Sequence, residues 1–252
     1  MSNLKNTLVK GITFNTTNGV TNSGIMNLSN CQGVSIEDNL FLNKVNATQS
    51  IDFISLNLSN CYDITVKNNE FRGGAIAIYE VGECPRKLEF SYNTIKDYSW
   101  VGIQVSGNST VPCTENIVKI DTNKFSGTTA MRMGISSTNG TEITRNQFNG
   151  YTGTSSSDAV IYVTNNDPVN FTGTTTIDKN VMTANIVNIN GIYANNVPKL
   201  NITNNKIATV DILGGGIAAH AVNISNSGSS SNPVYITKNE IKSGASGINQ
   251  AS

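Results

Sequence analysis

The chain has 252 residues, and its 17 basic and 17 acidic side chains give no net charge. Only 13% of the residues are charged, which argues against a polybasic nucleic-acid-binding protein and against an acidic disordered chain. Asn alone accounts for 38 residues and Gly for 22. Because both are unfavourable inside helices, the composition excludes a mainly helical protein and favours a turn-rich all-β fold.

Nine short segments repeat along the chain, with starts that are 23 to 34 residues apart. The segments are Thr7–Phe14, Val34–Phe41, Ile64–Phe71, Leu88–Ile95, Val118–Phe125, Thr141–Phe148, Thr175–Met182, Leu200–Ile207 and Val234–Ile241. In their first half, apolar residues tend to alternate with polar ones, which is typical of a strand with one buried face. Each segment therefore predicts a strand that ends in a turn.

The sixth position of the segment is Asn in eight of the nine copies, and the first copy has Ile12 instead. The eight residues are Asn39, Asn69, Asn93, Asn123, Asn146, Asn180, Asn205 and Asn239. A side-chain amide is both donor and acceptor, so stacked copies can form a hydrogen-bonded ladder, and Asn also tolerates the left-handed backbone of a sharp turn. The eighth position is always apolar and predicts an internal stack of side chains.

Further apolar stretches, often opened by Gly, lie between the segments and predict a second set of strands. They are Ile54–Leu58, Ala75–Val81, Val101–Val105, Met131–Ile135, Val160–Val163 and Ile217–Ile224. One such unit cannot bury its apolar face alone, but stacked copies form a continuous core. The repeat therefore predicts a solenoid.

The repeated segments resemble the short repeat of the right-handed parallel β-helix, pectate-lyase-like superfamily. The resemblance covers essentially the whole chain and implies one all-β domain over residues 1–252, a single-stranded solenoid of about nine coils with an Asn ladder and an internal aromatic and aliphatic stack. Lyases, hydrolases, tailspikes and adhesins share this fold, so the resemblance specifies function weakly.

The four cysteines are Cys31, Cys61, Cys84 and Cys113, and they recur at the turns of successive coils. Because they occupy one edge of the solenoid, we expect a buried ladder of reduced thiols rather than disulfides or a metal site. No cofactor or metal is expected.

Residues for acid–base chemistry are sparse. The candidates for catalysis are Glu80, Asp97 and Arg132, which a groove would have to bring together, and His220, the single histidine. A bystander role for His220 is the competing interpretation. Glu89, Lys119 and Glu142 share the second repeat position on three successive coils, and a mixed-sign row of this kind predicts a solvated face.

Aromatic side chains are the better candidates for contact with sugar, because their faces suit stacking on a pyranose ring. These residues are Tyr98, Trp100, Tyr151, Tyr162 and Tyr193. The competing interpretation is loop anchoring, with Trp100 folded back against the coil.

The leading hypothesis is a protein that recognises a polysaccharide or another surface glycan, as a phage tailspike, a tail appendage or a bacterial surface component. A polysaccharide lyase or glycoside hydrolase of the same fold is one alternative, and a structural spacer or adhesin segment without a small ligand is another. We expect a homo-oligomer, with a trimer implied by the tailspike resemblance, or a neighbouring virion or surface protein to cover the solenoid ends.

The expected location is a virion, the extracellular space or a cell surface, although the first residues lack the layout of a signal peptide. No nucleic-acid partner is expected. No apolar run reaches the ~18 residues of a membrane-spanning helix, so no membrane insertion is expected either.

Overall fold

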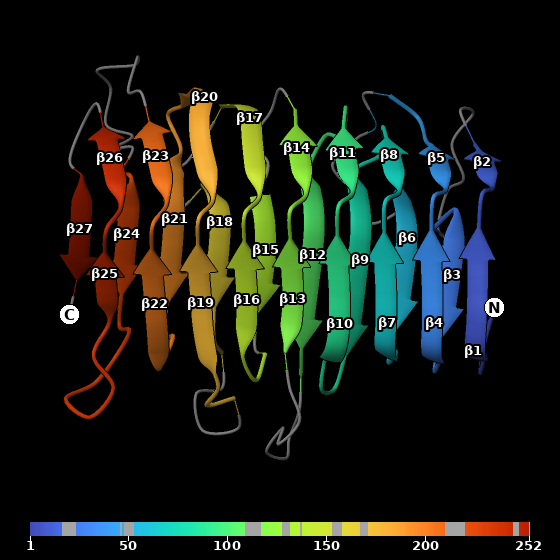
Figure 1. The fold of residues 1–252 in the computed structure, drawn as a ribbon, viewed down its shortest axis with the longest axis horizontal. Coiled ribbons are helices and arrows are strands. Elements are labelled where there is room, and N and C mark those ends of the chain that lie inside the picture. Colours follow the sequence, from blue (N-terminus) through green and yellow to red (C-terminus); the bar gives the residue numbers. More distant parts are fainter. Residues whose placement is uncertain are drawn as a thin grey trace.

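The computed structural model describes residues 1–16, 24–45, 47, 53–108, 117–127, 132–136, 138–152, 158–166, 171–209, 220–243 and 247–251. In these ranges the chain forms three parallel sheets of nine strands each, and each coil adds one strand to every sheet. In Figure 1 the coils advance from right to left, rising on the near side and descending on the far side, which makes the helix right-handed. The predicted parallel β-helix is confirmed.

The first sheet contains the strands that open the nine repeated segments. These strands are β1 (Lys5–Lys10), β4 (Gln32–Glu37), β7 (Tyr62–Lys67), β10 (Arg86–Ser91), β13 (Val118–Asp121), β16 (Thr141–Thr144), β19 (Thr174–Asp178), β22 (Lys199–Thr203) and β25 (Tyr235–Thr237).

The second sheet follows after a sharp turn and contains the end of each segment. Its strands are β2 (Thr13–Asn15), β5 (Leu40–Leu42), β8 (Glu70–Arg72), β11 (Thr94–Lys96), β14 (Lys124–Ser126), β17 (Gln147–Thr152), β20 (Val181–Val187), β23 (Lys206–Thr209) and β26 (Glu240–Ser243).

The third sheet contains the apolar stretches between the segments and lies behind the first sheet in Figure 1. Its strands are β3 (Met26–Ser29), β6 (Ile54–Ser59), β9 (Ile76–Gly82), β12 (Val101–Gly107), β15 (Arg132–Ser136), β18 (Ala159–Thr164), β21 (Asn190–Asn195), β24 (Val222–Ser225) and β27 (Ile248–Ala251).

The Asn ladder forms as predicted, and it has a direction. Asn123 shows the pattern: its backbone N–H and its Nδ2 both donate to Oδ1 of Asn146 on the next coil, at 2.9 and 3.0 Å. Its Nδ2 also donates to the carbonyl of Phe90 on the preceding coil, at 2.8 Å. At the first coil, where the side chain is Ile12, only the backbone N–H donates to Asn39 Oδ1, at 3.0 Å. Each buried amide therefore connects three coils.

The residue of the turn with a left-handed backbone is the one before the ladder Asn. The prediction that Asn occupies the sixth position because it tolerates this backbone is therefore wrong. The nine residues at this position have φ between 52° and 69°: Gly11, Asp38, Asn68, Tyr92, Thr122, Arg145, Lys179, Asn204 and Lys238. A left-handed backbone costs a non-glycine residue about 1–2 kcal/mol. The ladder offsets this cost at positions where the sequence offers Tyr, Thr, Arg or Lys.

The eighth repeat position forms a continuous internal stack, also as predicted. The residues pair in register from coil to coil: Phe14, Phe41, Phe71, Ile95, Phe125, Phe148, Met182, Ile207 and Ile241. The rings of Phe41 and Phe71 are stacked with centroids 4.6 Å apart and an interplanar angle of 10°. Inward-facing residues of the other two sheets complete the core.

The cysteines follow the prediction only in part. Cys31 and Cys61 are buried and free, and burial raises the pKa of Cys61 to about 11. Cys84, in contrast, is disulfide-bonded, so the expectation of four reduced cysteines is wrong. Equivalent positions on neighbouring coils lie about 4.8 Å apart, which is within the Cα separation that a disulfide accepts. Cys113 lies outside the described residues.

Candidate functional site

The outer face of the third sheet has two rows of outward-facing side chains, and in the described residues neither row contains a charge. The first row is in register from β3 to β27: Asn27, Asn57, Tyr79, Gln104, Gly134, Tyr162, Tyr193, Asn223 and Asn249. The second row, two residues farther along each strand, runs from β3 to β24: Ser29, Ser59, Val81, Ser106, Ser136, Thr164, Asn195 and Ser225. We call these two rows the uncharged face.

The other two sheets differ in this respect. The first sheet has Glu89, Lys119 and Glu142 on its outer surface, in the register predicted from the repeat. The second sheet has Glu70 on β8, where it forms ion pairs with Arg72 and Lys96. Among the described residues, two outer rows without charge are thus a feature of the third sheet and not of these two.

A pair of stacked tyrosines stands on the uncharged face. Tyr162 on β18 and Tyr193 on β21 are register neighbours, their ring centroids are 5.1 Å apart, and the rings are inclined by only 7°. Both side chains are half-buried. Burial, together with the neighbouring Tyr162 hydroxyl, raises the pKa of Tyr193 above its ordinary value. The pair presents a broad apolar surface with two polar ends.

A second aromatic group lies at the same sheet, two to four coils before Tyr162. Phe53, Tyr79 and Trp100 are partly exposed and pack against a small buried cluster around Ile76. Tyr79 belongs to the first row of the uncharged face, so Trp100 lies beside that face. Phe53 and Tyr79 were missed in the sequence. The signal that could have found Tyr79 is its equivalence to Tyr162 and Tyr193 when the third-sheet strands are aligned.

The two aromatic groups are separated by a flat stretch. Gln104 on β12 lies over Gly134 on β15, and a Cβ atom at position 134 would collide with the Gln104 amide. The Gln104 Nε2 donates to the Ser106 hydroxyl at 3.0 Å. Because Gly134 has no side chain, the surface between the aromatic groups stays low.

Amide side chains border the aromatic groups at both ends of the first row. Asn57 Nδ2 donates to Asn27 Oδ1 at 3.0 Å, and Asn249 Nδ2 donates to Asn223 Oδ1 at 3.0 Å. The Oδ1 of Asn57 is buried and has no hydrogen-bond partner, so a ligand on this face reaches only the other amide atoms. These groups offer neutral donors and acceptors of the kind that hydroxyl-rich ligands pair with.

Tyr98 and Tyr151 are not on the surface, so the prediction that they bind sugar is wrong. Both are buried, and their hydroxyl groups hydrogen-bond to each other at 2.8 Å inside the solenoid. Burial raises the pKa of both phenols. The pairing of β17 with β20 shifts after Phe148 by one extra residue on β20, and on β17 Gly150 has a φ of 84°, which breaks the alternation and turns Tyr151 inward. The sequence contains no signal for this shift.

The four catalytic candidates do not form one site in the described residues. Glu80 points inward, in register with buried Leu58 and Val105, because Tyr79 before it points outward. A polymer outside the solenoid cannot reach it, so Glu80 is withdrawn as a catalytic candidate. Asp97 is exposed and directly follows β11 of the second sheet. The side chain of Arg132 is outside the described residues.

His220 is half-buried, and its backbone N–H donates to Asn190 Oδ1 at 3.1 Å. This contact explains its position but gives the imidazole no catalytic partner by itself. A role for His220 in catalysis stays a prediction.

Glu80 is an unusual core residue. Neither carboxylate oxygen has a hydrogen-bond partner of normal geometry, and the side chain is fully buried. Burial raises the pKa of Glu80 to about 8, and the nearby backbone N–H of Cys61 offsets this only in part. At neutral pH the carboxyl group is therefore mainly protonated.

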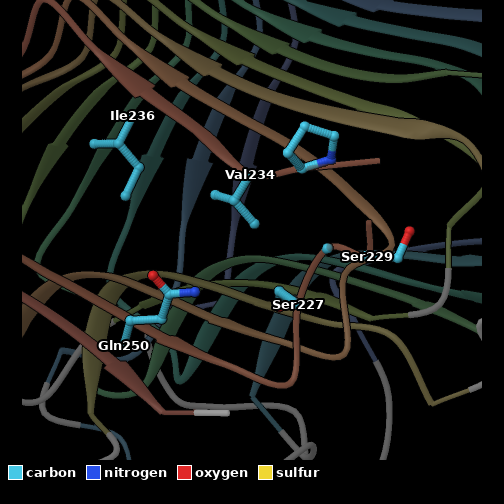
Figure 2. A pocket seen from close by; sticks show the side chains of 7 residues that line it. Ser227, Ser229, Val234, Ile236 and Gln250 are labelled. Atoms are coloured by element: carbon cyan, nitrogen blue, oxygen red, sulfur yellow. The ribbon is translucent and has the colours of Figure 1, made fainter. Parts of the chain in front are cut away.

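A hollow of about 380 Å³ lies against the last coil, lined among others by Ser227, Val234, Ile236 and Gln250. Figure 2 shows Val234 near the middle of this hollow, with the serines on one side and Ile236 and Gln250 on the other. It has no titratable side chain for acid–base chemistry.

Comparisons with known proteins give no match. No family model matches the sequence, and no match was found among the curated proteins or among the solved structures. Within the described ranges, no three His, Cys, Asp or Glu side chains gather as a metal site requires. In the same ranges no helix is long and apolar enough to cross a membrane. The structure therefore establishes the fold alone.

Proposed function

We propose that this chain recognises an uncharged polysaccharide on the outer face of its third sheet. The observation that carries the proposal is the stacked pair of Tyr162 and Tyr193 inside a face without charges. Sugar rings pack their C–H faces on aromatic side chains, and their hydroxyl groups pair with neutral amides and hydroxyls. A glycan without acidic groups needs no cationic partner, and the two rows offer none.

The wider assignment follows the repeat rather than the site. We propose a member of the pectate-lyase-like superfamily that acts as a phage tailspike, a tail appendage or a bacterial surface component, as a homo-oligomer or beside a neighbouring surface protein. The support is the parallel β-helix with its Asn ladder. The spacer alternative predicts that the uncharged face has no ligand.

The enzyme alternative has lost one of its candidates. Hydrolysis of a glycosidic bond requires two carboxyl groups on either side of the bond. With Glu80 inside the solenoid, a groove around Asp97 needs a different second carboxylate. We therefore favour recognition over catalysis.

The test is binding to immobilised dextran, glucan and mannan, compared with polygalacturonate, for the unaltered chain and for Tyr162→Ala and Tyr193→Ala. Each loss of an aromatic stacking contact of about 0.5–1.5 kcal/mol should weaken binding about two- to tenfold. Tyr235→Ala is the matched control, because Tyr235 is an exposed tyrosine on the first sheet.

Equal binding by all three variants would remove the uncharged face as the site. Newly formed reducing ends in the same incubation would favour the hydrolase alternative, and unsaturated ends the lyase alternative. No binding to any neutral glycan would favour the spacer.

A further inference from the structure

An elongated groove runs along the outer surface of the first sheet, on a different face from the uncharged one. Its first part is a hollow of about 530 Å³ lined by residues that include Asp63, Lys87, Ile117 and Lys119. Its second part, about 250 Å³, is lined by residues that include Ile117, Asn139 and Glu142. Ile117 lines both hollows, so the two parts adjoin at this residue.

One register row lies along the groove, from β7 to β19. The row consists of Thr65, Glu89, Lys119, Glu142 and Thr176. Neighbouring strands are about 4.8 Å apart, so the row extends over roughly 19 Å. The order of charges along it is negative, positive, negative.

Two charges of the row, those of Lys119 and Glu142, have no partner among the described residues. In the part of the chain that the structure describes, Lys119 and Glu142 form no ion pair and no hydrogen bond, although they are register neighbours. Another lysine and glutamate that are register neighbours, Lys206 and Glu240, do form an ion pair, with their charged atoms 3.6 Å apart. The ammonium and the carboxylate of the groove therefore stay available to a ligand.

Ile117 adds an apolar contact in the middle of the groove. Its side chain is 40% exposed and its φ is 65°, a left-handed conformation that is unfavourable for a β-branched residue. The equivalent positions of the two neighbouring coils contain Lys87, which is also left-handed at φ 50°, and Gly140, which adopts this backbone without strain. Such strain often occurs at binding sites. At Ile117 the strained backbone places an apolar side chain between two polar hollows.

We propose that this groove binds a zwitterionic glycan, in which neighbouring sugars carry a carboxylate and a free amino group. The ligand carboxylate lies at Lys119, the ligand amine lies at Glu142, and a sugar ring packs on Ile117. A purely acidic glycan would meet Glu89 and Glu142, and a purely basic one would meet Lys119. Only a ligand with alternating charge matches the row throughout.

The test is isothermal titration of the whole chain with an N-deacetylated heparosan oligosaccharide, in which glucuronate alternates with glucosamine. The N-acetylated parent supplies the acid alone, and a chitosan oligosaccharide of equal length supplies the amine alone. We expect the zwitterion to bind at least tenfold more tightly than either, and more weakly as salt is raised.

Lys119→Gln and Glu142→Gln should each weaken this binding at least fivefold. Lys124→Gln, at an exposed lysine on the second sheet, is the matched control and should leave it unchanged. Since these side chains are on the surface, the variants should fold, which circular dichroism checks.

Equal affinity for the three ligands, unaltered binding by both groove variants, or no binding of the zwitterion at millimolar concentration would each overturn the proposal. Tyr162→Ala should not change zwitterion binding. The groove and the uncharged face therefore succeed or fail separately.

Discussion

Replacing Glu80 by Leu should stabilise the protein, and the gain should grow with pH. Glu80 occupies the same inward position as Leu58 and Val105 on the neighbouring coils, so a leucine fits the row. Removing a buried carboxyl group without hydrogen-bond partners should contribute about 1–3 kcal/mol even where the group is protonated. Because all other residues stay the same, this difference in the free energy of unfolding arises from the side chain at position 80.

The pH dependence follows from the raised pKa. Glu80 has a pKa of about 8 in the folded chain and 4.5 ordinarily, so the folded state binds the proton more tightly between these values. The stability that the protonated group contributes is complete below pH 4.5 and is lost as the pH rises through 8. At 1.36 kcal/mol per pKa unit, the loss between pH 5 and pH 9 is about 4 kcal/mol.

The assay is urea unfolding, followed by circular dichroism, of the unaltered chain, Glu80→Leu and Glu80→Gln at pH 5, 7 and 9. Other groups titrate equally in all three proteins, so the differences between them isolate Glu80. Glu80→Gln keeps the size and polarity but cannot ionise, and it should share only the pH-dependent part of the gain. A difference between Glu80→Leu and the unaltered chain that stays constant from pH 5 to pH 9 would refute the burial argument.

Two further predictions concern the turn between the first and second sheets. Asn123→Leu should lower the free energy of unfolding by about 3 kcal/mol, because it leaves buried groups on Asn93, Asn146 and Phe90 without their partner; urea unfolding checks this, and a loss below 1 kcal/mol would contradict the ladder. Tyr92→Asn should raise the melting temperature, since Tyr92 is exposed at φ 57° and Asn tolerates this backbone about 1 kcal/mol better. An unchanged or lower melting temperature would contradict this, because contacts of the Tyr92 ring would then stabilise the fold by at least as much as the backbone gain.

The repeat positions could be predicted because identical environments require identical residues. A buried amide that must bond above and below, as Asn123 does, leaves few substitutes, so the sixth position is visible in eight copies. The left-handed residue before it was misplaced because side chains as different as Tyr92 and Lys179 occupy that position. Backbone strain of this kind is set by the ladder and not by residue type.

The candidate sites depend on the register between strands of neighbouring coils. This register is not visible in the sequence, because the repeat length varies from 23 to 34 residues. Tyr162 and Tyr193 were chosen from the sequence, but that they stack followed only when the strands were aligned across loops of different length. Tyr151 was misassigned because the alternation of β17 breaks at Gly150, and Glu80 because the alternation of β9 places it on the inner face beside outward-facing Tyr79. Cys84 was misassigned because cysteines that recur at one per coil on one edge still lie close enough, at about 4.8 Å between coils, to form a disulfide.

The direction of the Asn ladder has a consequence for synthesis on the ribosome. Each ladder amide from Asn39 to Asn205 donates its backbone N–H and its side-chain N–H toward the coil that follows, and the backbone N–H of Ile12 does the same. A coil that has left the ribosome thus keeps unmet donors until 23 to 34 more residues emerge. At 5–20 residues per second this is a delay of about 1–7 seconds. Closure of the solenoid must therefore trail translation by one coil, and each coil is completed by the next one to be made.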